Sequence, residues 1–561
     1  MINAVSAKKK KYIFTVVMVV MLILQLAVLF GYGSRKTGFH EDELYTYYST
    51  NKTAGLFIND RQWMERDDLR NDFIVLEGEQ FRYGVVKQMQ SWDVHPPLYY
   101  YIFHTVCSLV PGVFSKWLGI SVNLIAYVFS YVLLSYVVYT AITQGETNSK
   151  GGAGEKRAEI VPDVGRMESR GRILAFLTCL GWGFSAAVIS GVMFIRMYQW
   201  LTLFVLLCLA LHLRAMKKQD FRVRSFLLPL GVTVFLGFLT QYYYIIFHFF
   251  LGAGFCFYLL VNKKIRELIS YAITCAVGLG SALIYYPSAL SHIFRGYRGT
   301  EAVSEFSNAS NTWDRLQFFY GLFDDYMLYD TLSVWLLTLV LLAVTVGYLK
   351  KRGRLTSKIW NAPIGLMAFT AAGYFFTISK TALLLGETSN RYQLPVYGVL
   401  VFLLLYLTWM YVGSVLETFK GTKRNEGILA AVLLVVLLII DGMALAEGRV
   451  FFLYEEQEAV KEYVKANSDA PMVVFYNEAS GDHIWWLSDE LMEFPKVYLA
   501  SQGSQEPISD ATLISSDRIL AYVADYDNKE QVLEGLLEVN ENLTSYEVVA
   551  DKEAWSLYVL E

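Results

Sequence analysis

The chain has 561 residues, of which 55% are hydrophobic and only 18% are charged, a composition too apolar for a set of soluble domains. Its 36 Phe, 39 Tyr and 12 Trp exclude a disordered or low-complexity chain, which would be poor in these residues. The formal net charge of −4 hides an asymmetry, because residues 448–561 hold 7 Lys and Arg against 23 Asp and Glu. We therefore expect a basic, membrane-embedded part followed by an acidic, water-soluble part.

Charge-free apolar runs of about 20 residues, the length that crosses the hydrocarbon core of a bilayer, recur along residues 1–447. The first, Tyr12 to Ser34, follows a lysine cluster and indicates a retained anchor, because its apolar run is longer than that of a signal peptide and no A-x-A site ends it. Ser225 to Asn262 carries no charge over 38 residues and predicts a hairpin of two spans. The other single-span candidates are Ile173 to Ile195, Met197 to Leu213, Leu268 to Tyr286, Thr331 to Leu349, Ile359 to Ser379, Tyr392 to Leu416 and Gly427 to Ala446.

The stretch from Pro96 to Thr143 allows either two spans or one span preceded by an interfacial helix. With one span, the Lys/Arg-rich loops all fall on the side of the N-terminal lysine cluster, and the positive-inside rule places that side in the cytoplasm. With two spans, those loops would lie outside. We therefore expect a polytopic α-helical protein with about eleven transmembrane helices and a cytoplasmic N-terminus. The loops concerned are residues 143–172, 214–224, 263–266, 350–358 and 420–424.

Two sizeable pieces then lie outside the membrane: the first loop, residues 35–116, and a C-terminal domain, residues 448–561. The C-terminal domain has a helical pattern at Tyr454 to Ala466 and strand-like runs that predict a small α/β domain. The strand-like runs are Met472 to Tyr476, Ile519 to Val523 and Trp555 to Leu560. The five cysteines lie singly in apolar stretches, so no disulfide or zinc framework is expected.

The first loop begins with the acidic run His40-Glu41-Asp42-Glu43, close to the end of the first span. Such a run can be a solvated loop start or a helix N-cap. It can also supply a general base, because a carboxylate desolvated near the membrane among tyrosines such as Tyr45 has its pKa raised toward a useful range. The residue types alone do not decide between a structural role and a general base.

The same loop ends in Ser91-Trp92-Asp93-Val94-His95-Pro96-Pro97, where two prolines suit the first turn of a helix. A helix from Pro97 to about Leu109 would be too short to span and rich in aromatic residues, so we expect it to lie in the membrane interface. This arrangement returns Asp93 and His95 to the membrane surface.

The acidic run after the first span, followed by Trp92-Asp93-Val94-His95-Pro96-Pro97-Leu98-Tyr99-Tyr100, resembles the GT-C superfamily of polyprenyl-phosphate-dependent glycosyltransferases. The resemblance is to the protein O-mannosyltransferase and aminoarabinose-transferase-like branch, and it covers roughly residues 10–447. Three further segments resemble motifs of that branch, and in the expected topology all five lie on the outer side. They are Ile195-Arg196-Met197-Tyr198, Thr240-Gln241-Tyr242-Tyr243 and Asn390-Arg391-Tyr392-Gln393-Leu394-Pro395.

The resemblance implies roles for residues of this chain. Asp42 matches the acidic position that acts as base in the family and Glu43 the carboxylate beside it, although the additional Glu41 leaves the choice between Asp42 and Glu43 open. Arg196 or Arg391 would bind the donor phosphate, because a guanidinium holds phosphate oxygens without titrating. The remaining expected substrate-binding residues are Tyr45, Asp93, His95, Tyr198, Tyr242 and Tyr392.

Where many relatives have Glu-Ala before the arginine, this chain has Phe194-Ile195, so the sequence supports no metal-dependent mechanism. We expect no cofactor and no metal ligand set, and the sequence leaves a metal requirement open. Simpler interpretations also exist for the arginines and tyrosines: Arg196 can snorkel from a short loop, Arg391 can form an ion pair in a surface loop, and Tyr242 can belong to an aromatic belt.

The expected function is transfer of a sugar from a polyprenyl-phosphate donor to an extracytoplasmic glycan, lipid or protein hydroxyl, with a carboxylate base and, from the resemblance, inversion at the anomeric carbon. The expected location is a bacterial plasma membrane, with the C-terminal domain outside and no nucleic-acid partner. The main alternatives are a secondary transporter and a non-catalytic subunit of a cell-surface polysaccharide assembly system. A transporter needs charged coupling residues at mid-membrane, whereas the spans of this chain contain almost no charged residues, which argues against a transporter.

Overall fold

The computed structural model of the chain describes residues 2–52, 58–144, 164–353, 359–383, 385–416, 422–504, 506–526, 528–552 and 554–561. Its residues form two compact units. The first, called here the helical unit, comprises Met1–Tyr32, Gln90–Tyr99 and Ile120–Phe451. The second, called here the mixed unit, comprises Gly33–Met89, Tyr100–Gly119 and Phe452–Glu561.

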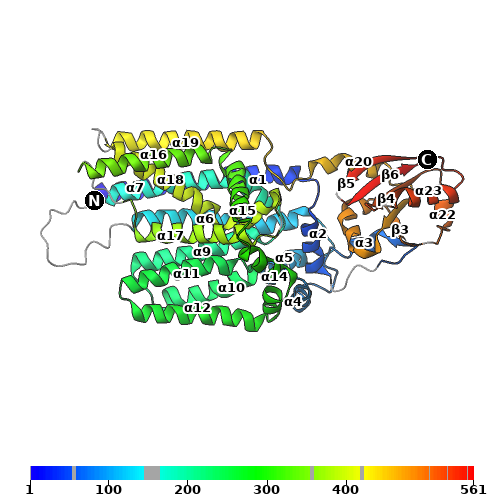
Figure 1. Ribbon diagram of the computed structural model, residues 1–561, viewed down its shortest axis with the longest axis horizontal. Coiled ribbons are helices and arrows are strands. Elements are labelled where there is room, and N and C mark those ends of the chain that lie inside the picture. The colour runs from blue at the N-terminus through cyan, green and yellow to red at the C-terminus, as the bar shows by residue number, and fades with distance from the viewer. Residues whose placement is uncertain are drawn as a thin grey trace. The chain divides into compact units, whose positions relative to one another are not determined.

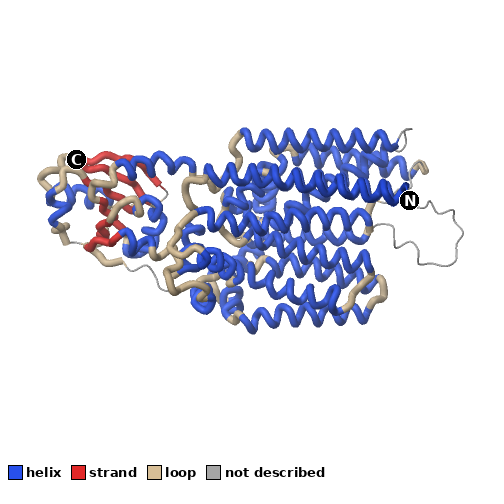
Figure 2. Tube along the Cα trace, turned by 180° about the vertical axis from the view of Figure 1, so that it is seen from behind, coloured by secondary structure: helices blue, strands red, loops and turns tan. Residues whose placement is uncertain are grey.

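The helical unit consists of long apolar helices that run side by side in both views (Figures 1 and 2). Among the described residues, ten helices are long and apolar enough to cross a membrane, and the bent pair α7 and α8 makes an eleventh span. This agrees with the expectation of about eleven spans for a multi-pass membrane protein. The helices are α1 (Ile2–Arg35), α6 (Lys116–Thr143), α7 (Val164–Gly183), α8 (Ala186–Met193), α9 (Tyr198–Lys218), α10 (Leu228–Thr240), α11 (Tyr244–Val261), α12 (Ile265–Tyr285), α16 (Leu332–Lys351), α17 (Ala362–Thr381), α18 (Leu394–Leu416) and α19 (Thr422–Ala446).

The one-span interpretation of residues 96–143 is confirmed. A short helix α5 (Leu98–Leu109) is followed by a single long helix, α6, and the place of α5 in the interface stays a prediction. Most of the expected loop 143–172 and parts of the loops 350–358 and 420–424 lie outside the described residues.

The expected span from Ile173 to Ile195 is broken rather than straight. α7 ends at Gly183, α8 begins at Ala186, and their axes differ by 58°. The cause is local: Ser185 caps α8 by accepting a hydrogen bond from the Val188 amide at 3.4 Å, and a new N-cap requires extended backbone between the two helices. Gly183 suits the break, because a Cβ there would lie 2.3 Å from the Gln25 side chain.

Shorter elements connect the spans of the helical unit. They are the helices α13 (Ser288–Phe294), α14 (Tyr297–Ser307) and α15 (Thr312–Phe323), the π-helical turns η2 (Val223–Leu227) and η3 (Asp324–Leu328), and the 3₁₀ turn η4 (Glu387–Tyr392).

The mixed unit is built on one six-stranded sheet with the order β1-β3-β2-β4-β6-β5. The central strands β3 (Lys496–Ser501), β2 (Met472–Tyr476) and β4 (Ile519–Ala524) are parallel. The outer strands β1 (Gln62–Glu65), β6 (Trp555–Leu560) and β5 (Tyr546–Lys552) are antiparallel to their neighbours. The three strands expected from the sequence are present as β2, β4 and β6.

The remaining helical elements of the chain lie in or next to the first loop and in the C-terminal region. They are α2 (Glu41–Asn51), α3 (Arg66–Arg70), α4 (Tyr83–Trp92), η5 (Glu455–Gln457), α20 (Glu458–Ala466), η6 (Glu478–Leu487), α21 (Ser488–Leu491), α22 (Ala511–Ser515) and α23 (Lys529–Val539).

Strand β1 belongs to the first loop, yet it forms an edge of the sheet made by the C-terminal residues. It pairs with β3 so that Trp63 lies opposite Tyr498, and the Trp63 indole donates a hydrogen bond to Asp510 Oδ2 at 2.8 Å. Trp63 also packs against the buried core of the sheet. The first loop and the C-terminal residues therefore fold as one unit.

Candidate active site

Arg196 lies in a tight turn between α8 and α9 that a neighbouring helix holds in place. The amide of Asn123, on α6, donates to the carbonyls of Val192 at 3.1 Å and Phe194 at 2.7 Å. Asn123 is completely buried, so these bonds form without competition from water. The turn directs the Arg196 side chain, which is only 3% exposed, toward His95.

The imidazole of His95 lies between a carboxylate and two guanidinium groups. Its Nδ1 is 2.7 Å from Asp93 Oδ2, and its Nε2 is 3.1 Å from Arg196 Nη2 and 3.4 Å from Arg298 Nη1. A guanidinium can only donate hydrogen bonds, so Nε2 must accept and the proton must lie on Nδ1, from where it is donated to Asp93. His95 is therefore a neutral imidazole.

The electrostatics agree with this assignment. Burial, together with the positive charges of Arg196 and Arg298, lowers the pKa of His95 against the opposing influence of Asp93. Burial alone would raise the pKa of Asp93, but the electrostatic attraction to His95, the hydrogen bond with His95 and the charge of Arg196 hold that pKa below its usual range. Arg196 and Arg298 thus meet at one neutral base, which Asp93 orients from its other side.

Arg391 lies in a different setting, among aromatic rings. Its guanidinium carbon is 5.1 Å from the ring centres of Phe194 and Tyr392 and 5.8 Å from that of Tyr198. The side chain is 5% exposed, and it also donates to the Tyr392 hydroxyl at 3.1 Å. Cation–π contact of this kind orients a guanidinium while leaving its charge undiminished.

The aromatic rings around Arg391 are themselves in contact. Tyr198 and Tyr392 meet edge to face at 5.7 Å, and Tyr243 meets Tyr392 at 5.6 Å. The backbone at Tyr392 is held by the Tyr374 hydroxyl, which donates to its carbonyl at 2.9 Å. The result is a rigid aromatic wall beside the arginine.

Tyr242 connects the turn between α10 and α11 to the segment before Asp93. Its hydroxyl is 2.8 Å from His292 Nδ1, and His292 Nε2 is 3.3 Å from the Ser91 carbonyl. A carbonyl accepts only, so His292 Nε2 carries the proton and Tyr242 donates to Nδ1. The Tyr286 hydroxyl donates to the His95 carbonyl at 3.2 Å, which fixes the same segment from α12.

In the mixed unit, the acidic run forms the start of α2. His40 is the N-cap and Glu43 completes a capping box by accepting from the His40 amide at 2.7 Å. The completely buried Glu43 carboxylate also accepts from Lys36 Nζ at 2.9 Å, and Lys36 donates to the Phe452 carbonyl at 2.6 Å. Burial lowers the pKa of Lys36, while Glu43 opposes that shift.

Asp42 and Tyr45 lie on the same helix in less enclosed positions. The Asp42 side chain is 16% exposed, and its Oδ2 is 3.9 Å from His40 Nδ1. Tyr45 is half-buried and meets Trp485 edge to face at 5.8 Å. The acidic run therefore forms the first turn of α2, with His40 as the N-cap and Glu43 completing the capping box.

The structure brings seven of the ten expected site residues into the helical unit: Asp93, His95, Arg196, Tyr198, Tyr242, Arg391 and Tyr392. Asp42, Glu43 and Tyr45 belong to the mixed unit. The list of site residues expected from the sequence did not include Arg298. Lys36 was also absent from that list, because a lone lysine after a span usually only marks topology.

Within the described parts of the chain, no group of three or more His, Cys, Asp or Glu side chains is placed to hold a metal ion. The described side chains that meet in the helical unit are buried arginines, a neutral histidine oriented by Asp93, and tyrosines.

No family model and no curated protein matches the chain, but solved structures do. The chain is similar to ArnT from Cupriavidus metallidurans, crystallised with undecaprenyl phosphate, with a TM-score of 0.50 at 13% identity over 96% of this chain and 97% of that one. A second match is the archaeal oligosaccharyltransferase AglB from Archaeoglobus fulgidus, in complex with an inhibitory peptide and a dolichol-phosphate, with a TM-score of 0.46 at 10% identity over 98% of this chain and 74% of that one. The likeness to ArnT shows that this chain has a GT-C-like fold, as the sequence motifs predicted.

Proposed function

We propose that the protein is a membrane glycosyltransferase that takes a sugar from a polyprenyl-phosphate donor and transfers it to an acceptor hydroxyl outside the cytoplasm. The observation that supports this most directly is the meeting of Arg196 and Arg298 at neutral His95. A guanidinium binds phosphate oxygens through several directed hydrogen bonds, so two guanidinium groups that converge on one point suit an anionic group. ArnT, whose fold this chain shares, was crystallised with undecaprenyl phosphate.

The donor phosphate would bind at Arg196 and Arg298, with Arg391 as a further cation in the same unit. A sugar bonded through its anomeric carbon to phosphate already has a good leaving group, so the enzyme must stabilise the charge that develops on the departing phosphate. Buried guanidinium groups do this well because their charge does not titrate. His95 and Asp93 would hold Arg196 in the orientation that this requires.

Asp42 is the proposed general base. It would accept the proton of the acceptor hydroxyl as the hydroxyl oxygen attacks the anomeric carbon and the bond from that carbon to the phosphate oxygen breaks. Glu43 is the weaker candidate, because its buried carboxylate already accepts from Lys36 and from the His40 amide. Its proposed role is to hold the start of α2, and a single displacement would invert the anomeric configuration.

The tyrosines would line the substrate site. Tyr198 and Tyr392 form part of the wall around Arg391, Tyr242 is held through His292, and Tyr45 follows the acidic run on α2. From the loop charges we propose that the N-terminus lies in the cytoplasm and the C-terminal residues outside it. The proposed location is a bacterial plasma membrane.

The test is mass spectrometry of total lipid from cells that carry the wild-type protein, no protein, Asp42→Asn or Glu41→Gln. We expect the deletion and Asp42→Asn strains to accumulate the same polyprenyl-phosphate sugar, whereas Glu41→Gln, the neighbouring carboxylate, should match wild type. If no polyprenyl-phosphate sugar accumulates in the deletion strain, the donor assignment is wrong. If the deletion strain accumulates the donor but Asp42→Asn behaves as wild type, the base assignment is wrong.

A further inference from the structure

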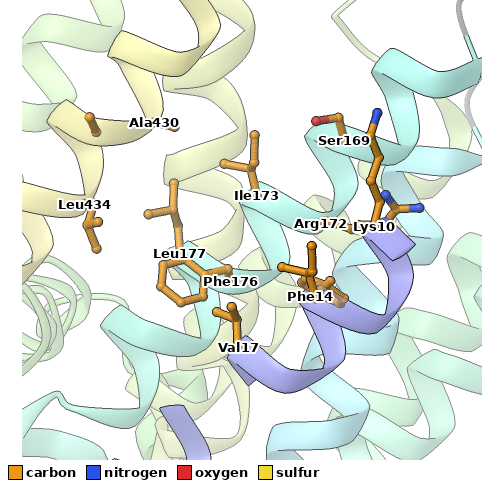
Figure 3. A pocket seen from close by; sticks show the side chains of 12 residues that line it. Lys10, Phe14, Val17, Ser169, Arg172, Ile173, Phe176, Leu177, Ala430 and Leu434 are labelled. Atoms are coloured by element: carbon orange, nitrogen blue, oxygen red, sulfur yellow. The ribbon is translucent and has the colours of Figure 1, made fainter. Parts of the chain in front are cut away.

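A groove at the N-terminal end of α1 is walled by α1, α7 and α19 and has a volume of about 370 Å³. It lies beside the first turns of α7, whereas Arg196 follows α8, so the groove and the proposed active site are at opposite ends of the broken span. Figure 3 shows apolar side chains along the groove and Lys10, Ser169 and Arg172 together at one end.

Two hydrogen bonds hold α1 to its neighbours at positions further along its length than the groove. Gln25 donates to the Cys179 carbonyl at 2.8 Å, and the Tyr131 hydroxyl, on α6, donates to the Met18 carbonyl at 2.7 Å. The groove lies on the N-terminal side of these contacts. On the α19 side the groove is lined by the small side chains of Ala430 and Ala431, which leave room for a ligand.

The walls are regular helix faces. On α1, the residues Lys10, Ile13, Phe14 and Val17 follow the three- and four-residue spacing of one helix face. The same spacing on α7 places a polar residue, Ser169, one turn before a run of apolar ones. The groove is therefore amphipathic along its length, with a charged end and an apolar interior.

The charge at that end is positive. Glu168 pairs with Arg172 at 2.6 Å, and Glu426 pairs with Arg166 at 2.8 Å, so both nearby carboxylates are already engaged by arginines. Among the described residues Lys10 has no carboxylate partner. A cation and a hydroxyl at the mouth of an apolar groove in a membrane helix bundle match an anionic headgroup with a hydrocarbon chain behind it.

We propose that this groove binds one anionic phospholipid, with its phosphate at Lys10 and Ser169 and one acyl chain between α1, α7 and α19. A bound chain would occupy the space that these residues of α1, α7 and α19 line. The proposal is independent of the reaction catalysed at the other end of the spans.

The test uses the full-length protein in mixed micelles of phosphatidylglycerol and phosphatidylcholine, with retained lipid counted by native mass spectrometry. We expect wild type to retain one phosphatidylglycerol in preference to phosphatidylcholine. Lys10→Gln should weaken that preference about fivefold, the effect of losing one lysine near an anionic headgroup. Lys9→Gln, which removes an adjacent exposed lysine outside the groove, should behave as wild type.

A second pair of variants tests the apolar part. Ala430→Phe fills the groove and should abolish retention, whereas Val435→Phe, at a lipid-facing position on the same helix outside the groove, should not. The proposal would be overturned if wild type retained phosphatidylcholine as well as it retains phosphatidylglycerol. It would also be overturned if Lys9→Gln weakened the preference as much as Lys10→Gln does, because the attraction would then be diffuse and not specific to the groove. Displacement of phosphatidylglycerol by added polyprenyl phosphate at equal concentration would overturn the assigned lipid class.

Discussion

The two units of this protein bury positive charge in opposite ways. In the mixed unit, Lys36 is completely buried against the Glu43 carboxylate, and both side chains also bind the backbone. In the helical unit, buried Arg196 donates to a neutral imidazole, and buried Arg391 is surrounded by aromatic rings. The first arrangement neutralises its charge internally and suits a structural role. The second orients its guanidinium groups with a histidine and with aromatic rings, and guanidinium groups oriented in this way suit an anionic substrate.

The largest effect is expected when the cation of the Lys36–Glu43 pair is removed. Lys36→Met leaves the Glu43 carboxylate buried without its cation, which costs about 3–5 kcal/mol in other buried ion pairs. We expect a large fall in melting temperature, measured on the purified protein in detergent. In the double variant Lys36→Met/Glu43→Gln no charge is buried, and much of the stability should return. Equal melting temperatures for Lys36→Met and wild type would show that the pair is not structural.

The corresponding change in the helical unit should act on the reaction rather than on stability. Arg196→Gln removes a charged donor worth about 1.5–3 kcal/mol, so we expect kcat/KM for transfer from a polyprenyl-phosphate sugar to fall roughly 10- to 100-fold, with little change in melting temperature. Arg196→Lys keeps the charge but not the planar donor geometry and should fall between the two. If Arg196→Gln instead unfolds the protein with unchanged kcat/KM in the folded fraction, the arginine is structural.

Arg298 offers a smaller effect with a distinct pH signature. Its positive charge helps to lower the pKa of His95, so Arg298→Gln should raise the pKa of that imidazole. Because the network requires neutral His95, activity is lost as the pH falls through the pKa of His95, and the acid limb of the pH–rate profile should move to higher pH in the variant. An acid limb that stays in place while activity falls would mean that Arg298 acts without His95.

The smallest expected effect concerns strand β1. Trp63→Phe keeps the aromatic ring against the sheet but loses the hydrogen bond to Asp510, for an expected cost of about 1 kcal/mol. Thermal unfolding compared with Trp313→Phe, at an exposed tryptophan of the helical unit, measures it. If Trp63→Phe lowers the stability no more than Trp313→Phe does, the hydrogen bond at strand β1 contributes little to the stability of the mixed unit.

Most of the membrane fold follows from the sequence, because a charge-free run of about 20 residues has few stable alternatives to a spanning helix. The break between α7 and α8 was not predicted, since Ser185 and Gly183 are ordinary residues within an apolar run. Strand β1 was not predicted either. It has four residues and is stabilised by pairing with β3, more than 400 positions later in the chain.

The site could be predicted as a set of residues but not as a set of contacts. The motifs around His95, Arg196, Tyr242 and Arg391 were identified in the sequence, and the helical unit brings them together. His95 is neutral because Arg196 and Arg298 both donate to it. These three residues lie far apart in the sequence, so no local sequence pattern predicts that they meet. The contacts that distinguish Glu43 from Asp42 likewise depend on Lys36, whose burial is a property of the folded unit.

The most direct test of the account separates binding from chemistry. Binding of polyprenyl phosphate to the purified full-length protein should be measured for wild type, Asp42→Asn and Arg196→Gln. We expect Asp42→Asn to bind polyprenyl phosphate as tightly as wild type but to lose transfer activity. Arg196→Gln should bind polyprenyl phosphate at least tenfold more weakly than wild type. Equal binding by all three proteins, or loss of binding in Asp42→Asn alone, would contradict it.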